Sequence, residues 1–84
     1  ADVVSSLQLI PNPAQDRVLV KYQGLKGTLS LSIIDLNGKL LHKDEIKGDQ
    51  QEVLIELKDY SAGIYILSVS DEHGQIHRKK LVVK

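Results

Sequence analysis

A two-residue alternation of side-chain character runs through this chain and constrains its fold more than any other feature. Successive side chains of a strand point to opposite faces of a sheet, so this period predicts strands with one buried face. The positions expected to be buried are Val18, Val20 and Tyr22; Leu29, Leu31 and Ile33; Val53, Ile55 and Leu57; and Tyr65, Leu67 and Val69. The three- and four-residue spacing of a helix persists over no long window, so the chain is predicted to be nearly all β.

Turn-forming residues divide the chain into short segments. Asn37-Gly38 predicts a tight type I′ hairpin turn, which needs φ > 0 at both positions. Looser turns are expected at 24–27, 47–50 and 71–74. We therefore expect seven strands, near residues 7–10, 16–22, 28–35, 39–46, 51–57, 64–70 and 75–83. Short strands at this spacing indicate a seven-stranded antiparallel immunoglobulin-like β-sandwich.

Both prolines of the chain, Pro11 and Pro13, stand one residue apart near its start. A proline has no backbone N–H and a fixed φ, and it pushes the residue before it into extended geometry. The segment is therefore predicted to be a stiff, extended connector between two strands. Asn12 is expected to bond its own backbone neighbours and to rigidify this turn. Gly63 is expected to supply φ > 0 at the entry to a later strand.

The composition excludes several classes of function. Eleven basic and eleven acidic residues cancel without a basic cluster, so nucleic acid is not an expected partner. The absence of cysteine excludes disulfides, thiolate catalysis and cysteine metal sites. There is no methionine, so the chain has no initiator or signal peptide of its own and is expected to be a module of a longer protein. We expect residues 1–6 to be a linker remnant and residues 7–84 to be the domain.

The reactive side chains form no recognisable catalytic pattern. His73 and His77 are four residues apart but are separated by Gly74 in a turn, so surface histidines are favoured over metal ligands. Glu52 and Glu56 lie on the polar side of a strand with no aromatic platform, which favours solvated charge over glycoside chemistry. We therefore expect no catalytic residue, no metal site and no cofactor, and an enzyme is not indicated.

Four local patterns remain, and they follow one another in a particular order. Leu9-Ile10-Pro11-Asn12-Pro13-Ala14 comes first, and Ile34-Asp35-Leu36-Asn37-Gly38-Lys39 follows. Leu57-Lys58-Asp59-Tyr60-Ser61-Ala62-Gly63-Ile64-Tyr65 is third, and Arg78-Lys79-Lys80-Leu81-Val82-Val83-Lys84 closes the chain.

This order resembles the type A C-terminal sorting domain of the type IX secretion system, also called the Por secretion system. That family is marked by Pro-Asn-Pro, an apolar-Asp-x-x-Gly-Lys turn, Leu-x-x-Gly-Ile-Tyr, and a basic-apolar strand that ends in lysine. Ile10 replaces a frequent aromatic residue, and Tyr60 replaces a common leucine. The recognition residues implied by the resemblance are Pro11, Asn12, Pro13, Asp35, Gly38, Lys39, Gly63, Ile64, Tyr65, Lys79, Lys80, Leu81, Val82, Val83 and Lys84.

The resemblance also implies partners and a location. Such a domain follows an N-terminal cargo domain through the periplasm, and the outer-membrane translocon recognises it and passes the cargo to the cell surface or the medium. A sortase-like peptidase usually cleaves the domain and attaches the cargo to anionic lipopolysaccharide. The alternative is a retained immunoglobulin-like surface module for binding, adhesion or signalling.

The last strand is expected to lie at a sheet edge. Its unpaired backbone groups could then add to a receptor sheet, or could pair two copies into a dimer, with Lys79 and Lys80 opposing self-association. An ordinary protected edge strand is the other interpretation of the same residues.

Overall fold

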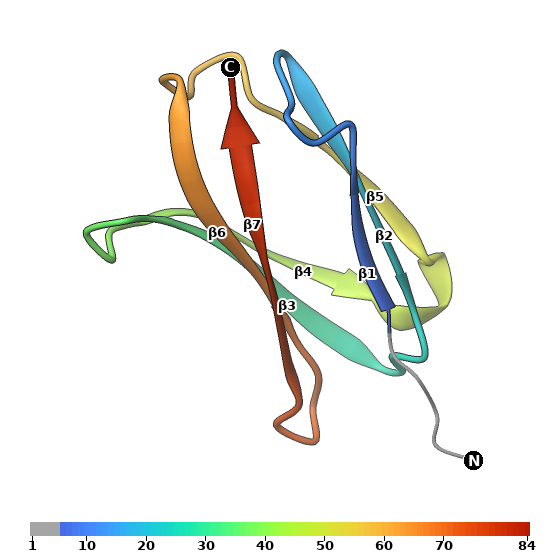
Figure 1. The fold of residues 1–84 in the computed structure, drawn as a ribbon. Coiled ribbons are helices and arrows are strands. Elements are labelled where there is room, and N and C mark those ends of the chain that lie inside the picture. The colour runs from blue at the N-terminus through green and yellow to red at the C-terminus, as the bar shows by residue number, and fades with distance from the viewer. Residues whose placement is uncertain (1–5) are drawn as a thin grey trace.

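The computed structural model describes residues 6–84, which fold into seven strands and one short 3-10 turn (Figure 1). The strands are β1 (Ser6–Ile10), β2 (Arg17–Gln23), β3 (Thr28–Asp35), β4 (Leu40–Lys47), β5 (Glu52–Glu56), β6 (Gly63–Ser70) and β7 (Ile76–Val83). The 3-10 turn η1 spans Gly48–Gln50. All seven expected strands are present, with ends within two residues of the predicted ones. β1 already begins at Ser6, which we had placed in the linker, and residues 1–5 lie outside the described part of the chain.

The strands form two antiparallel sheets. One has the order β1-β2-β5, and the other has the order β4-β3-β6-β7. Val18, Val20 and Tyr22 of β2 are buried while the residues between them are not, and the same alternation holds in β3 and β6. The alternating pattern therefore identified the inner faces of β2, β3 and β6 correctly.

Both sheets contribute to one hydrophobic core. No charged residue is among the buried residues of the described part of the chain. The buried hydrophobic residues are Leu7, Leu9, Ala14, Val18, Val20, Tyr22, Leu25, Leu29, Leu31, Ile33, Ile46, Ile55, Leu57, Tyr65, Leu67, Val69, Leu81 and Val83. No helix within residues 6–84 is long and apolar enough to cross a membrane.

The β3–β4 turn differs from the expected type I′ turn. Among the described residues only Gln51 has φ > 0 without being glycine, so Asn37 keeps a negative φ and Gly38 alone is left-handed, at φ 85°. The Gly38 N–H donates to the Asp35 carbonyl, and Asp35 Oδ1 accepts the Asn37 and Lys39 N–H groups at 2.9 Å each. This is a type I turn followed by a left-handed glycine, stabilised by an aspartate.

The β6–β7 turn repeats this arrangement. The Gly74 N–H donates to the Asp71 carbonyl, Gly74 has φ 86°, and Asp71 Oδ1 accepts the His73 and Gln75 N–H groups at 2.9 Å each. The shared sequence Asp-x-x-Gly therefore forms the same turn at both ends of the β3–β6 strand pair. The local sequence determines this geometry because the aspartate satisfies donors only two and four residues away.

Candidate functional site

The first motif contacts the last one directly. The Asn12 side chain donates from Nδ2 to the Lys80 carbonyl at 2.9 Å, and its Oδ1 accepts the Val82 N–H at 3.1 Å. These bonds span about seventy positions of the chain, whereas a bond to its own backbone neighbours was expected. That expectation was wrong because the side-chain amide supplies both a donor and an acceptor to the edge of β7.

Ala14 continues this attachment with backbone groups. Its N–H donates to the Val82 carbonyl at 2.7 Å, and its carbonyl accepts the Lys84 N–H at 2.8 Å. Ala14 and Val83 form a parallel bridge, and Ala14 is fully buried. Figure 1 shows the result: the chain between β1 and β2 lies beside the end of β7, next to the C-terminus. The Pro11–Pro13 segment and Ala14 thus cover the outer edge of β7 near the C-terminus.

β7 is an edge strand, as expected, but its C-terminal half is not a free edge. Asn12 and Ala14 occupy the carbonyls of Lys80 and Val82 and the N–H groups of Val82 and Lys84. In an antiparallel pair alternate residues direct their backbone groups away from the partner. The outward groups of β7 not covered by these bonds are therefore those before Val82, apart from the Lys80 carbonyl. The expectation that the last strand offers unpaired backbone groups to a receptor is therefore wrong for the C-terminal end of that strand.

The third motif pairs with the fourth across β6 and β7. Gly63 lies opposite Val83, Ile64 opposite Val82, and Tyr65 opposite Leu81. Gly63 is an ordinary strand residue without a positive φ, contrary to our prediction, and the nearest atom to an added Cβ would be Tyr65 Cε1 at 4.0 Å.

The second motif joins the same region through β3. Asp35 lies opposite Tyr65, which in turn lies opposite Leu81. Gly38 and Lys39 follow in the turn, and Asp35 holds this turn through the Lys39 N–H. The four motifs, which are dispersed in the sequence, therefore meet at one end of the four-stranded sheet. We call this end the motif end. Ala14, the last residue of the first motif, belongs to the same region, although it was not among the expected recognition residues.

Two tyrosines pack at this end. The rings of Tyr60 and Tyr65 meet edge to face, with centroids 5.3 Å apart and planes at 69°. The Tyr65 hydroxyl donates to the Ser61 carbonyl, whereas the buried Tyr60 hydroxyl has no partner among the described residues. Burial, and then the neighbouring Tyr65, raises the pKa of Tyr60 above its ordinary value. A hollow of about 380 Å³ opens beside them, lined by Asp35, Leu41, Asp59, Tyr60, Ser61 and Tyr65.

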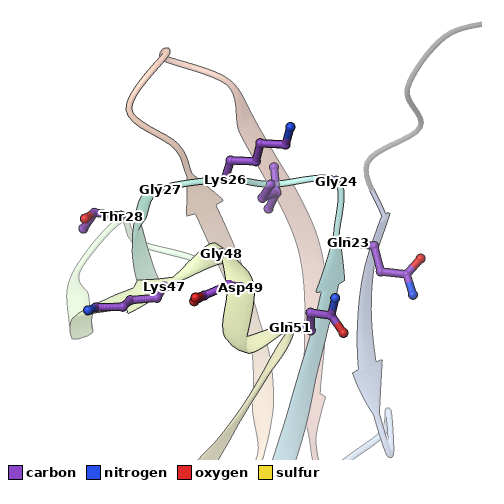
Figure 2. A pocket seen from close by; sticks show the side chains of 10 residues that line it. Gln23, Gly24, Lys26, Gly27, Thr28, Lys47, Gly48, Asp49 and Gln51 are labelled. Carbon is purple, nitrogen blue, oxygen red and sulfur yellow. The ribbon is translucent and has the colours of Figure 1, made fainter.

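Another hollow lies at the opposite end of the fold, where β2 ends and β3 begins (Figure 2). It encloses about 630 Å³ between the β2–β3 turn and the segment around η1. The Gly48 N–H donates to the Gly27 carbonyl at 2.8 Å, and a Cβ on Gly48 would stand 2.4 Å from the Leu25 carbonyl oxygen. Gly48 therefore lets these two segments pack closely, and we attribute the hollow to this packing. Its lining residues are Gln23, Gly24, Leu25, Lys26, Gly27, Thr28, Lys47, Gly48, Asp49 and Gln51.

The histidines do not gather into a site. Within residues 6–84 no three side chains of the metal-binding types come together. His42 is half-buried on β4 and His73 is exposed in the β6–β7 turn. His77 is half-buried with its Nε2 enclosed and unpartnered, so it is less exposed than the surface position we expected.

Fold and motif end together define a class: a small all-β domain of two antiparallel sheets whose first connector is fastened to its last strand. Within that class the chain belongs to the family of secretion system C-terminal sorting domains, whose family model matches residues 8–84. This family comprises the C-terminal sorting signals of type IX secretion, which implies export to the cell surface or secretion.

A curated relative also aligns with the full length of the chain. It is a protein of Formosa agariphila described as an endo-acting ulvan lyase, and it is 27% identical over 84 residues. The match covers 100% of this chain and 16% of that relative, so the chain spans a small part of the relative's length.

Proposed function

We propose that this domain carries an N-terminal cargo protein from the periplasm through the type IX translocon to the cell surface, and that its motif end is what the translocon recognises. The observation that carries the proposal is the assembly of all four family motifs at one end of the four-stranded sheet. Their positions far apart in the sequence give no local reason for this assembly.

The fold is best described, in our proposal, as immunoglobulin-like. The three-plus-four division of seven antiparallel strands supports this description. Tyr65 stands near the start of the sixth strand, and its hydroxyl donates to the Ser61 carbonyl four residues upstream. That contact matches the tyrosine corner found where the fifth strand leads to the sixth in immunoglobulin-like domains.

Processing on the cell surface completes the proposal. A sortase-like peptidase cleaves upstream of β1, within or before residues 1–5, and joins the cargo to anionic lipopolysaccharide. β1 supports this placement because Leu7 and Leu9 are buried, so a cut within β1 would need core residues to unfold first.

The test is a fusion of residues 1–84 to the C-terminus of a periplasm-targeted reporter. In a host with a type IX system the reporter should reach the surface, and in the same host without the translocon it should stay in the periplasm. Equal surface signals in both hosts would refute the proposal. Comparing the reporter's size before and after export measures cleavage, and an unchanged size would favour a retained surface module.

Removing the last five residues, Lys80 to Lys84, is not a specific test of recognition. The deletion takes away Leu81 and Val83, which are almost fully buried, as well as the partners of Asn12. The truncated fusion is therefore expected to fail by unfolding. Variants that change only exposed side chains separate recognition from stability.

A further inference from the structure

The outer face of the four-stranded sheet is divided into two halves of different character. Ser30 lies opposite Ser70 and Ser32 opposite Ser68, so one half has hydroxyls at its centre. In the other half Ile34 lies between Leu40 and Ile66, and the next pair is Ile64 with Val82. We call the five side chains of that half the aliphatic patch: Ile34, Leu40, Ile64, Ile66 and Val82.

The aliphatic patch is open to solvent. Leu40 is 52% exposed and Ile64 is 41% exposed, while Ile34, Ile66 and Val82 are half-buried. On β3, β6 and β7 the alternate residues fill the core, so the patch residues of these strands cannot turn inward. Leu40 shares their face because it lies opposite Ile34. Adjacent strands stand about 4.8 Å apart, so the row Leu40, Ile34 and Ile66 across β4, β3 and β6 is apolar and continuous, and the pair Ile64 and Val82 adjoins it. Contiguous exposed apolar patches mark interaction sites more often than single exposed residues do.

The patch belongs to the motif end of the fold. Ile64 and Val82 are motif residues, and Lys80 extends the row beyond Ile66. Ser6, where the described chain begins, lies at the far end of β1 from the Pro11–Pro13 segment. Five strand residues separate the two by roughly 16 Å. Cargo attached before β1 therefore leaves the patch accessible.

The charges of this face select among the possible occupants. Strand alternation places four basic side chains on it and one acidic side chain, in a chain whose net charge is zero. The bases are Lys43, Lys47, Arg78 and Lys80, and the acid is Glu45. Two copies pairing through this face would oppose like charges, which disfavours a dimer.

A membrane surface is also a poor match for the patch. Proteins that enter the membrane interface use Trp, Tyr or Phe at that depth. This chain has no Trp or Phe, and its tyrosines are two buried residues and one half-buried residue.

We propose that the aliphatic patch, with Lys80 and Arg78 at its rim, is the docking surface for a protein component of the secretion machinery whose own surface is apolar at the centre and acidic around it. This inference rests on the proposed sorting function. Burial of the patch against the partner supplies affinity, and the basic rim favours encounter with an acidic partner.

The test uses the reporter fusion with paired double substitutions. Ile34→Thr with Ile66→Thr removes apolar area from the centre of the patch and keeps β-branched side chains. The matched control is Leu19→Thr with Leu54→Thr, which changes a neighbouring pair on the outer face of the other sheet. Both variants are checked for an intact thermal transition. We expect the patch variant to lose surface delivery about tenfold or more, while the control is delivered like the unmodified fusion.

A photo-crosslinking residue at Ile66 should capture a component of the secretion machinery in cells, and the same residue at Leu54 should not. Equal delivery of the patch and control variants, with the unmodified fusion delivered, overturns the docking surface alone. Failure of the unmodified fusion overturns the sorting function itself. Binding to vesicles of phosphatidylglycerol and phosphatidylcholine that the patch variant loses would assign the patch to lipid. Sedimentation as a dimer that the patch variant abolishes would assign it to a second copy.

Discussion

Asn12 offers the sharpest test of how the motifs hold together. Its side chain makes two hydrogen bonds to the edge of β7, to the Lys80 carbonyl and to the Val82 N–H. In Asn12→Ala both are lost, while the two backbone bonds of Ala14 can remain. Each intramolecular hydrogen bond contributes about 0.5–1.5 kcal/mol net, and these groups are solvent-exposed, so the lower half of that range applies to each of the two bonds. We expect the free energy of unfolding to fall by about 1–2 kcal/mol.

The same variant has a local signature in hydrogen exchange measured by NMR. Because Asn12 Oδ1 protects the Val82 N–H, that amide should exchange about tenfold faster in Asn12→Ala. The amide of Leu81, whose backbone groups face β6, should change no more than the global stability does. Asn12→Asp is the matched control, since a carboxylate can still accept the Val82 N–H but cannot donate to the Lys80 carbonyl. An unchanged Val82 rate in Asn12→Ala, or equal rates in both variants, would refute this account.

Three further predictions concern tyrosines and glycines. Tyr65→Phe loses the bond to the Ser61 carbonyl and should lower the free energy of unfolding in urea by about 0.5–1.5 kcal/mol. Tyr60→Phe removes an unpartnered buried hydroxyl and should leave the free energy of unfolding equal or higher. Equal losses in both variants would contradict these contacts. The pKa of Tyr60 is raised in the folded state, so the stability that its neutral hydroxyl contributes is complete below about pH 10 and is lost as the pH rises through the folded pKa. Tyr60→Phe should therefore flatten the fall of the melting temperature at alkaline pH. An identical fall in both proteins would contradict the raised pKa. Gly48→Ala should destabilise by about 1–3 kcal/mol because its Cβ meets the Leu25 carbonyl, whereas Gly63→Ala should be neutral or stabilising in the same thermal melts; a tolerated Gly48→Ala would contradict the close packing.

The local features of the chain were predictable from sequence. Alternation in β2, β3 and β6 identified the buried face of each strand, because the direction of a strand side chain depends only on its position in the pleat. The turn at Asp35 and Gly38 was located correctly but assigned the wrong type. The prediction rested on the Asn-Gly pair, whereas the Asp35 carboxylate satisfies the turn's N–H groups and leaves only the glycine left-handed.

The site was predictable only as a set of residues. The family motifs named Asn12, Gly63 and the last strand, but the local roles we gave them were wrong. Asn12 bonds β7 instead of its own turn, and Gly63 pairs with Val83 without a positive φ. The patch residues Ile34, Leu40 and Ile66 were not singled out, because their neighbourhood on the outer face depends on the strand order β4-β3-β6.

By itself the sequence determined that the chain is β, where its strands lie, and which family it belongs to, because pleat direction and turn chemistry act over a few residues. Only the tertiary structure decided which strands are neighbours. That order brings the Pro11–Pro13 segment to β7 across about seventy positions, covers an edge expected to be free, and aligns five aliphatic side chains on one outer face. Strand order depends on how both sheets close over a shared core, so no local pattern could supply it.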